Sequence, residues 1–115
     1  MITWREVVCK CKCGHTLTTS FFNALNDLRE GFGKPIIVLS GARCAEHNRS
    51  VGGAKQSAHL DGRAADLHKT DELLAFCTVE NLEKYGLYME DPHYTTDWIH
   101  LTDRAPASGK RIFKP

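Results

Sequence analysis

The aliphatic residues of this sequence come in short runs, and that shortness limits the folds that the chain can adopt. The longest such run, Ile-Ile-Val-Leu at 36–39, has only four members. A membrane-spanning helix needs about 20 predominantly apolar residues, so we expect no insertion into a membrane. Short apolar runs bounded by Gly, Pro, Asn and Ser predict β-strands instead.

Segments of this kind recur along the chain. The run at 36–39 predicts a strand that is buried on both faces, because its apolar residues are continuous. Further strands are predicted at 64–67, 87–89 and 98–101, with an edge strand at 111–113. Between the first two strands, the segment 42–60 is too rich in Gly, Ser and Asn for a long regular element, and we expect one helical turn at 45–49.

Two stretches carry the pattern of a helix. In the first, apolar residues recur at steps of four, three and four, which places them on one helical face. They are Phe21, Leu25, Leu28 and Phe32. Threonines and a serine at 18–20 can cap its start, and Gly33 is suited to its end. The second stretch begins after Thr70 and extends to Tyr85, with a break near Thr78.

These elements predict an α+β fold with a small antiparallel sheet and two main helices. The 115 residues support one domain, 1–115. A formal charge of +1 leaves no basic excess to neutralise phosphates, so we expect no nucleic-acid partner. Residues 1–6 lack the basic and then apolar pattern of a secretory signal peptide, so we expect synthesis in the cytoplasm without one.

Five cysteines in that compartment are expected as thiols or metal ligands more than as disulfides. Cys9, Cys11 and Cys13 alternate, so in an extended segment their thiols project to one side. They form a possible second, structural zinc site, although Cys-x-Cys lacks the two-residue spacer of ordinary zinc knuckles.

Residues able to bind a metal concentrate at 57–66 and again at 97–100. His59, Asp66 and His100 form a three-ligand set for a catalytic zinc, with the fourth position left for water. Two neutral histidines and one carboxylate leave the site near +1, which helps to lower the pKa of the bound water towards about 7. The chain between His59 and Asp66 must turn back, and Gly62 permits the positive φ that such a turn can require.

A general base is the next requirement of this chemistry. If 98–101 is a strand, Trp98 and His100 share one face. Asp97 can then reach a metal-bound water only if it lies in the turn directly before that strand. Glu90 and Asp91, on the loop that leads to it, are alternative bases.

The pattern Ser-x-His-x-x-Gly-x-Ala-x-Asp at 57–66, followed by Asp-x-x-His at 97–100, resembles the family of zinc D-Ala-D-Ala carboxypeptidases and L-alanyl-D-glutamate endopeptidases. That family shares its fold with the Hedgehog signalling domain. The resemblance extends upstream through 40–48 and 51–53. The tail at 108–113 is similar to small phage-encoded members.

The resemblance implies that His59, Asp66 and His100 hold zinc and that Asp97 is the general base. Many relatives have Glu where this chain has Asp97, and a shorter carboxylate must lie closer to the water. Arg43 matches the arginine that holds a substrate carboxylate or polarises the scissile carbonyl. The alternative for Arg43 is an ion pair with a nearby acid.

Three further residues are expected near the substrate. Ser57 matches a serine beside the family's metal site. His47 is a polar loop residue that can support the site or contact substrate, and Trp98 can line the cleft because it neighbours His100.

The resemblance further implies a zinc-dependent peptidase that hydrolyses the peptide stem of bacterial peptidoglycan. An endolysin-like endopeptidase and a DD-carboxypeptidase both remain open, and the short loop at 90–97 favours the endopeptidase. We expect a monomer that acts at the cell wall after release, in a phage or prophage setting. The alternative is a catalytically silent zinc module that binds wall peptide or a protein.

Overall fold

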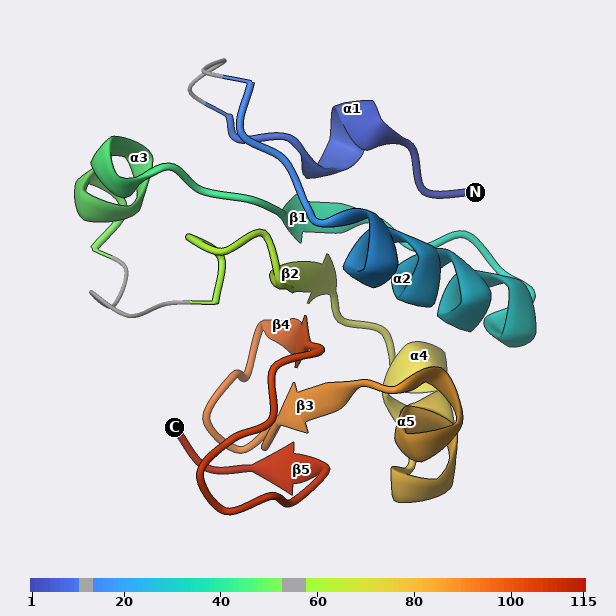
Figure 1. Cartoon of the computed structure of the whole chain (residues 1–115). Helices are drawn as coiled ribbons and strands as arrows, with labels where there is room; N and C mark the ends of the chain where they lie inside the picture. Colours follow the sequence, from blue (N-terminus) through green and yellow to red (C-terminus); the bar gives the residue numbers. More distant parts are fainter. Residues whose placement is uncertain (11–13, 53–57) are drawn as a thin grey trace.

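The computed structural model describes residues 1–10, 14–52 and 58–115, and within them the chain forms a five-stranded sheet (Figure 1). The strand order is β1-β2-β4-β3-β5. The bounds are β1 Val38–Ser40, β2 Ala64–His68, β3 Tyr88–Glu90, β4 Trp98–Thr102 and β5 Ile112–Phe113. All neighbouring pairs are antiparallel except β3 and β5, which run parallel.

The helices of the described residues lie mostly before β1 and between β2 and β3. Their bounds are α1 Trp4–Val7, α2 Thr19–Phe32, α3 Ala45–Ser50, α4 Asp71–Phe76 and α5 Val79–Tyr85. The predicted α+β class is therefore confirmed, with α2 and the α4–α5 pair as the two main helical regions.

Threonine side chains begin helices α2, α4 and α5, and for α2 and α4 the sequence predicted such a cap. Thr18 caps α2, Thr70 caps α4 and Thr78 caps α5, in each case by accepting a hydrogen bond from a backbone N–H of the first turn. The cap at Thr78 is the predicted break in the second helical stretch. Each such cap contributes about 1 kcal/mol to helix stability.

The first strand differs from its prediction. The sequence placed it at 36–39 with both faces buried, whereas β1 is Val38–Ser40 at an edge of the sheet. Ile36 lies in the core, but Ile37 and Leu39 are 60% and 38% exposed. A strand at the edge of the sheet is not covered on both faces. A local run of apolar residues cannot reveal where in the sheet its strand will lie.

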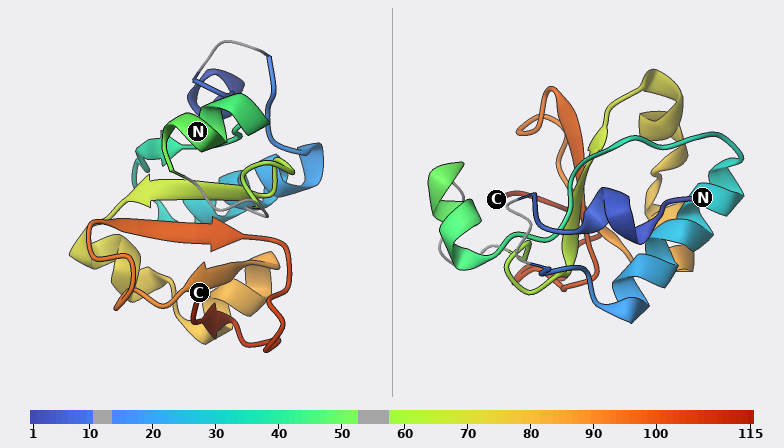
Figure 2. Two further views of the ribbon diagram at one scale, coloured as in Figure 1. Left: turned by 90° about the vertical axis from the view of Figure 1, so that its left-hand side faces the viewer. Right: turned by 90° about the horizontal axis from the view of Figure 1, so that it is seen from above.

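Helices α2, α4 and α5 lie on one side of the sheet, and α3 lies on the other together with the C-terminal end (Figure 2). The core fills the first of these two sides. Its members from the strands are Ala65, Leu67, Met89, Ile99 and Leu101, and those from the helices include Phe21, Leu25, Leu28, Leu73 and Leu82. Because side chains alternate along a strand, the residues between them face the side of α3.

No helix in the described ranges is long and apolar enough to cross a membrane.

Candidate metal centre

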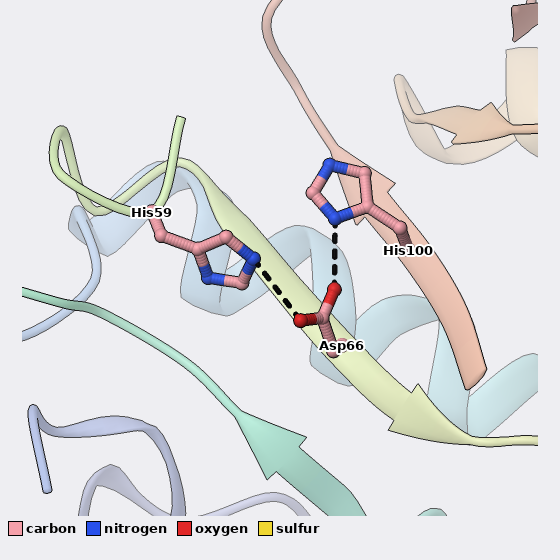
Figure 3. Close-up of side chains that lie close together, drawn as sticks. All are labelled: His59, Asp66 and His100. Atoms are coloured by element: carbon pink, nitrogen blue, oxygen red, sulfur yellow. Dashed lines mark hydrogen bonds and ion pairs between the residues drawn. The ribbon is translucent and has the colours of Figure 1, made fainter. Parts of the chain in front are cut away.

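His59, Asp66 and His100 converge on the sheet face that is turned away from the core (Figure 3). Nε2 of His59 lies 3.3 Å from Oδ2 of Asp66, and Nδ1 of His100 lies 2.8 Å from Oδ1 of the same carboxylate. One ligand atom from each residue can be chosen so that all three lie within 4.8 Å of one another. These residues, far apart in sequence, thus form a group that can hold a metal ion.

Two of the three side chains come from the centre of the sheet. Asp66 on β2 lies directly opposite His100 on β4 in the antiparallel register. Directly opposed residues place their side chains on the same face with Cβ atoms about 5 Å apart. Their neighbours Leu67, Ile99 and Leu101 are buried on the other face, as the predicted strand parity required.

His59 comes from a turn outside the sheet and is held by other means. Its ring is buried, and Nδ1 lies 2.6 Å from the carbonyl oxygen of Gly41. That hydrogen bond keeps the proton on Nδ1, so Nε2 is left as the atom that faces Asp66. The backbone also fastens this turn, because the Arg43 N–H donates to the His59 carbonyl at 2.9 Å.

Two glycines permit these close approaches. A Cβ on Gly41 would lie 2.3 Å from the carbonyl oxygen of Val7, so a larger residue there would displace backbone. Gly62 ends the turn that carries His59 with a φ of +68°, and a Cβ there would lie 2.6 Å from the Thr16 carbonyl oxygen. The positive φ predicted for Gly62 is confirmed.

The Asp66 carboxylate is the electrostatic centre of the group. Burial alone would raise its pKa, but the side chains of His100 and His59 next to the carboxylate lower it well below its usual range. The Arg43 guanidinium lies 3.2 Å from Oδ2 of Asp66 and is itself largely buried. The carboxylate is therefore ionised at neutral pH, which a metal ligand requires.

The donor set fits zinc. Two imidazole nitrogens and one carboxylate oxygen are zinc ligands, and three protein ligands are the number found in catalytic zinc sites. The hydrogen bond from His59 to a backbone carbonyl is the outer support typical of such histidines. His59, Asp66 and His100 can accordingly hold the ion that the sequence predicted.

Arg43 is fixed by three side chains at once. Its Nε donates to Ser40, one terminal nitrogen donates to Asn48, and the other pairs with Asp66. The ion pair that was an alternative for Arg43 is thus present, and its partner is a member of the metal group. The guanidinium consequently lies beside the position of an ion.

The possible bases come from two segments of the chain, the end of β3 with the residue after it and the bend before β4. Asp97 is exposed and lies in the bend directly before β4, which is the position that its predicted role requires. Glu90 is the last residue of β3 and lines a pocket together with His100. Asp91 follows it, and its carboxylate accepts a hydrogen bond from the His93 backbone N–H.

The other predicted contacts have different outcomes. Trp98 lies on β4, half-buried and two residues from His100 on the same face. His47 lies on α3, whose predicted single turn is confirmed as a six-residue helix. Ser57, Cys11 and Cys13 lie outside the described residues. Cys9 is buried, and its Sγ accepts a hydrogen bond from the Cys44 N–H. A second metal site there stays a prediction.

Several residues with a structural part in the site had no role assigned from the sequence. Gly41 and Asn48 support His59 and Arg43 through contacts across 18 and five residues. Phe113 places its ring edge-on to His100, with centroids 6.4 Å apart. The segment at 40–48 was a signal for the first two, but the strand order that brings β5 towards β4 had none.

Comparison with known families agrees with this geometry. The family model described as Peptidase M15 matches residues 2–102, a range that includes the whole metal group. A search of curated proteins finds no match for the chain.

Proposed function

The chain belongs to the peptidase M15 family, and on that premise we propose that it is a zinc-dependent peptidase that hydrolyses the peptide stem of bacterial peptidoglycan. The observation that carries this proposal is the convergence of His59, Asp66 and His100 within the matched range. Family membership implies a metallopeptidase, and the donor set of two imidazoles and a carboxylate supports zinc as the metal.

The three residues would hold the ion by donors that are already oriented. A bound zinc ion would supply Lewis acidity to the scissile carbonyl and lower the pKa of a bound water to about 7. Asp66 stays ionised through its contacts with both histidines. The Gly41 carbonyl fixes the ring of His59, so little reorganisation is needed at this side chain.

Asp97 is our proposed general base. It would take the proton of the attacking water and pass it to the leaving amine, a role that contributes about 10²- to 10⁴-fold to the rate. Its position in the bend before β4 supports this role, because a residue there is not bound by the alternation of the strand. Glu90 and Asp91 are the competing carboxylates.

Arg43 is proposed to bind the substrate carboxylate or the oxyanion that develops at the scissile carbonyl. Its contacts with Ser40, Asn48 and Asp66 leave the guanidinium in one orientation, so little side-chain entropy is lost on binding. Ser57, His47 and Trp98 are proposed as further substrate contacts. We also propose a monomer that acts at the cell wall after release, in a phage or prophage setting.

Digestion of purified peptidoglycan tests the proposal. We expect the zinc-loaded protein to release stem fragments, chelator to abolish the release and added zinc to restore it. Mass spectrometry of the products then identifies the bond that is cut, which separates an endopeptidase from a carboxypeptidase. Wild-type protein that binds zinc but cleaves no stem peptide would instead support a catalytically silent module.

The Asp97→Asn variant tests the base. We expect kcat to fall by about 10²- to 10⁴-fold while zinc affinity stays unchanged, because Asp97 is not a ligand. Asp91→Asn serves as the matched control on the same loop and should keep most of the activity. If Asp91→Asn instead shows this loss of kcat and Asp97→Asn is fully active, Asp91 is the general base and Asp97 is not.

A further inference from the structure

One row of side chains crosses the whole sheet through the metal group. Ser40 pairs with Asp66 across β1–β2, Asp66 pairs with His100 across β2–β4, and Glu90 pairs with Phe113 across β3–β5. The β3–β4 register pairs Met89 with Leu101, and its next position sets Glu90 opposite His100.

Opposed residues of neighbouring strands share a face, so the members of this row face the same side as the metal ligands. Independent contacts agree with the register. Asp66 and His100 are within hydrogen-bond distance, and the rings of His100 and Phe113 meet edge-on. Glu90, His100 and Phe113 also line one pocket of about 350 Å³.

The row carries opposite charges on its two sides. On the β1 side, Arg43 is bound to Ser40 and Asp66 and presents a cation. On the β3 side, Glu90 presents a carboxylate that makes no side-chain hydrogen bond or ion pair within the described part of the chain. The other charged residue that lines this pocket, Arg104, pairs with Asp61 at 2.9 Å.

The distance between the Arg43 side and the Glu90 side of the row suits a bound peptide. From β2 to β3 there are two strand spacings, about 10 Å, which is the length of about three extended residues. A substrate that lies across the strands would therefore have its carboxylate end near Arg43 and a side chain in the pocket beside Glu90. The walls that Phe113 and Ala105 contribute suit the apolar stem of such a side chain.

We propose that Glu90 is a specificity residue that selects a substrate side chain with a terminal ammonium group, as in a diamino acid. This inference rests on the proposed peptidase function and adds the chemistry of one substrate position. The aliphatic stem of the side chain packs against Phe113, and its ammonium group donates to the Glu90 carboxylate. Charge-assisted hydrogen bonds of this kind are about twice as strong as neutral ones.

The position of Glu90 in the row also distinguishes a specificity residue from a general base. An ion held by His59, Asp66 and His100 would lie beside β2 and β4, whereas Glu90 belongs to the next strand and lines the pocket beside His100. A base changes the rate for every substrate. A side-chain binding residue changes it only for substrates that carry the ammonium group.

Three synthetic stem peptides of one backbone provide the test with the zinc-loaded protein. The first has a lysine with a free amine and an acetylated amino terminus. The second differs only by acetylation of the lysine, and the third has the acetylated lysine with a free amino terminus. We expect kcat/KM of the wild type to be about tenfold or more higher for the first than for the other two.

The Glu90→Gln variant should lose this preference, because its kcat/KM for the first peptide falls to the value for the second. Glu83→Gln, an exposed glutamate of helix α5, is the matched control and should keep the preference. Circular dichroism and zinc affinity identical to the wild type establish that Glu90→Gln is folded and loaded. Equal kcat/KM for the first two peptides, a preference for the third, or an equal loss of kcat for all in Glu90→Gln would each overturn the inference.

Binding to the metal-free protein keeps this test independent of catalysis. Calorimetric titration with the first two peptides should show tighter binding of the free amine in wild type and no difference in Glu90→Gln. If the wild type cleaves none of the peptides but retains this difference in Kd, the proposed reaction fails and the assignment of Glu90 stands. Equal Kd values in wild type would contradict the assignment by itself.

Discussion

The metal group combines two kinds of support. Asp66 and His100 lie on the central strands β2 and β4, where the backbone ladder sets their separation. His59 lies in a turn outside the sheet, where one hydrogen bond to the Gly41 carbonyl and the backbone contact of Arg43 hold it. The strand-borne pair is thus fixed by regular structure, whereas the turn-borne ligand is fixed by contacts between loops, including the close approaches at Gly41 and Gly62.

This difference indicates where the site is vulnerable. A strand residue keeps its place as long as the ladder persists, and the ladder is buttressed by core residues on its other face. A turn residue depends on the residues that touch it, most of all Gly41, which nothing larger can replace without movement of Val7. We therefore expect substitutions around His59 to weaken the site without loss of the fold.

The largest effect is expected for Asp66→Ala, which removes a ligand from the strand-borne pair. Both histidines and Arg43 lose their shared partner. Zinc affinity should fall by more than the roughly 100-fold that substitutions in a metal site's outer shell can reach, and peptidase activity should be lost with it. Titration against a competing chelator measures the affinity. Tight, stoichiometric zinc in this variant would mean that Asp66 is not a ligand.

An intermediate effect is expected for Gly41→Ala, which disturbs only the support of the turn-borne ligand. The added Cβ displaces the backbone near Val7 and with it the carbonyl that orients His59. Zinc affinity should fall by about 10- to 100-fold, the range for outer partners of ligating histidines. The far-ultraviolet circular dichroism spectrum should stay that of the wild type. Unchanged zinc affinity would show that His59 needs no such support.

The smallest effect is expected from His59→Ala in the metal-free protein, and it should be local. Loss of the ring leaves the Gly41 carbonyl without its side-chain donor, which costs about 1 kcal/mol. The amides of Ala42 and Arg43, which are bonded to Val7 and His59, should then exchange with solvent roughly fivefold faster. Amides of the β2–β4 ladder should be unaffected. Faster exchange throughout the sheet would contradict the proposed difference, because the support of His59 would then not be independent of the strand ladder.

The sequence predicted helices α2, α4 and α5 well because their signals are local. Thr18, Thr70 and Thr78 cap the helices that follow them, and the apolar positions of α2 are its buried face. The strand parity at Trp98 and His100 was equally readable. The segment at 36–39 was not, because burial of both faces depends on the neighbours that a strand finds.

The three residues that could hold a metal were predictable because zinc chemistry restricts residue types, and the spacing within 57–66 and 97–100 is specific. The bonds that support them were not. Contacts from Gly41 to His59 and from Asn48 to Arg43 join loops whose approach depends on the packed molecule. A backbone carbonyl carries no side-chain signal by which such a role could be recognised.

The sequence by itself therefore determined which side chains can bind a metal and which local segments form helices. Only the tertiary structure decided that Ser40, Asp66, His100, Glu90 and Phe113 form one row across the sheet. The physical reason is that strand order and register arise from the burial of the opposite face as a whole. Neither can be read from five segments that are each free to pair in several ways.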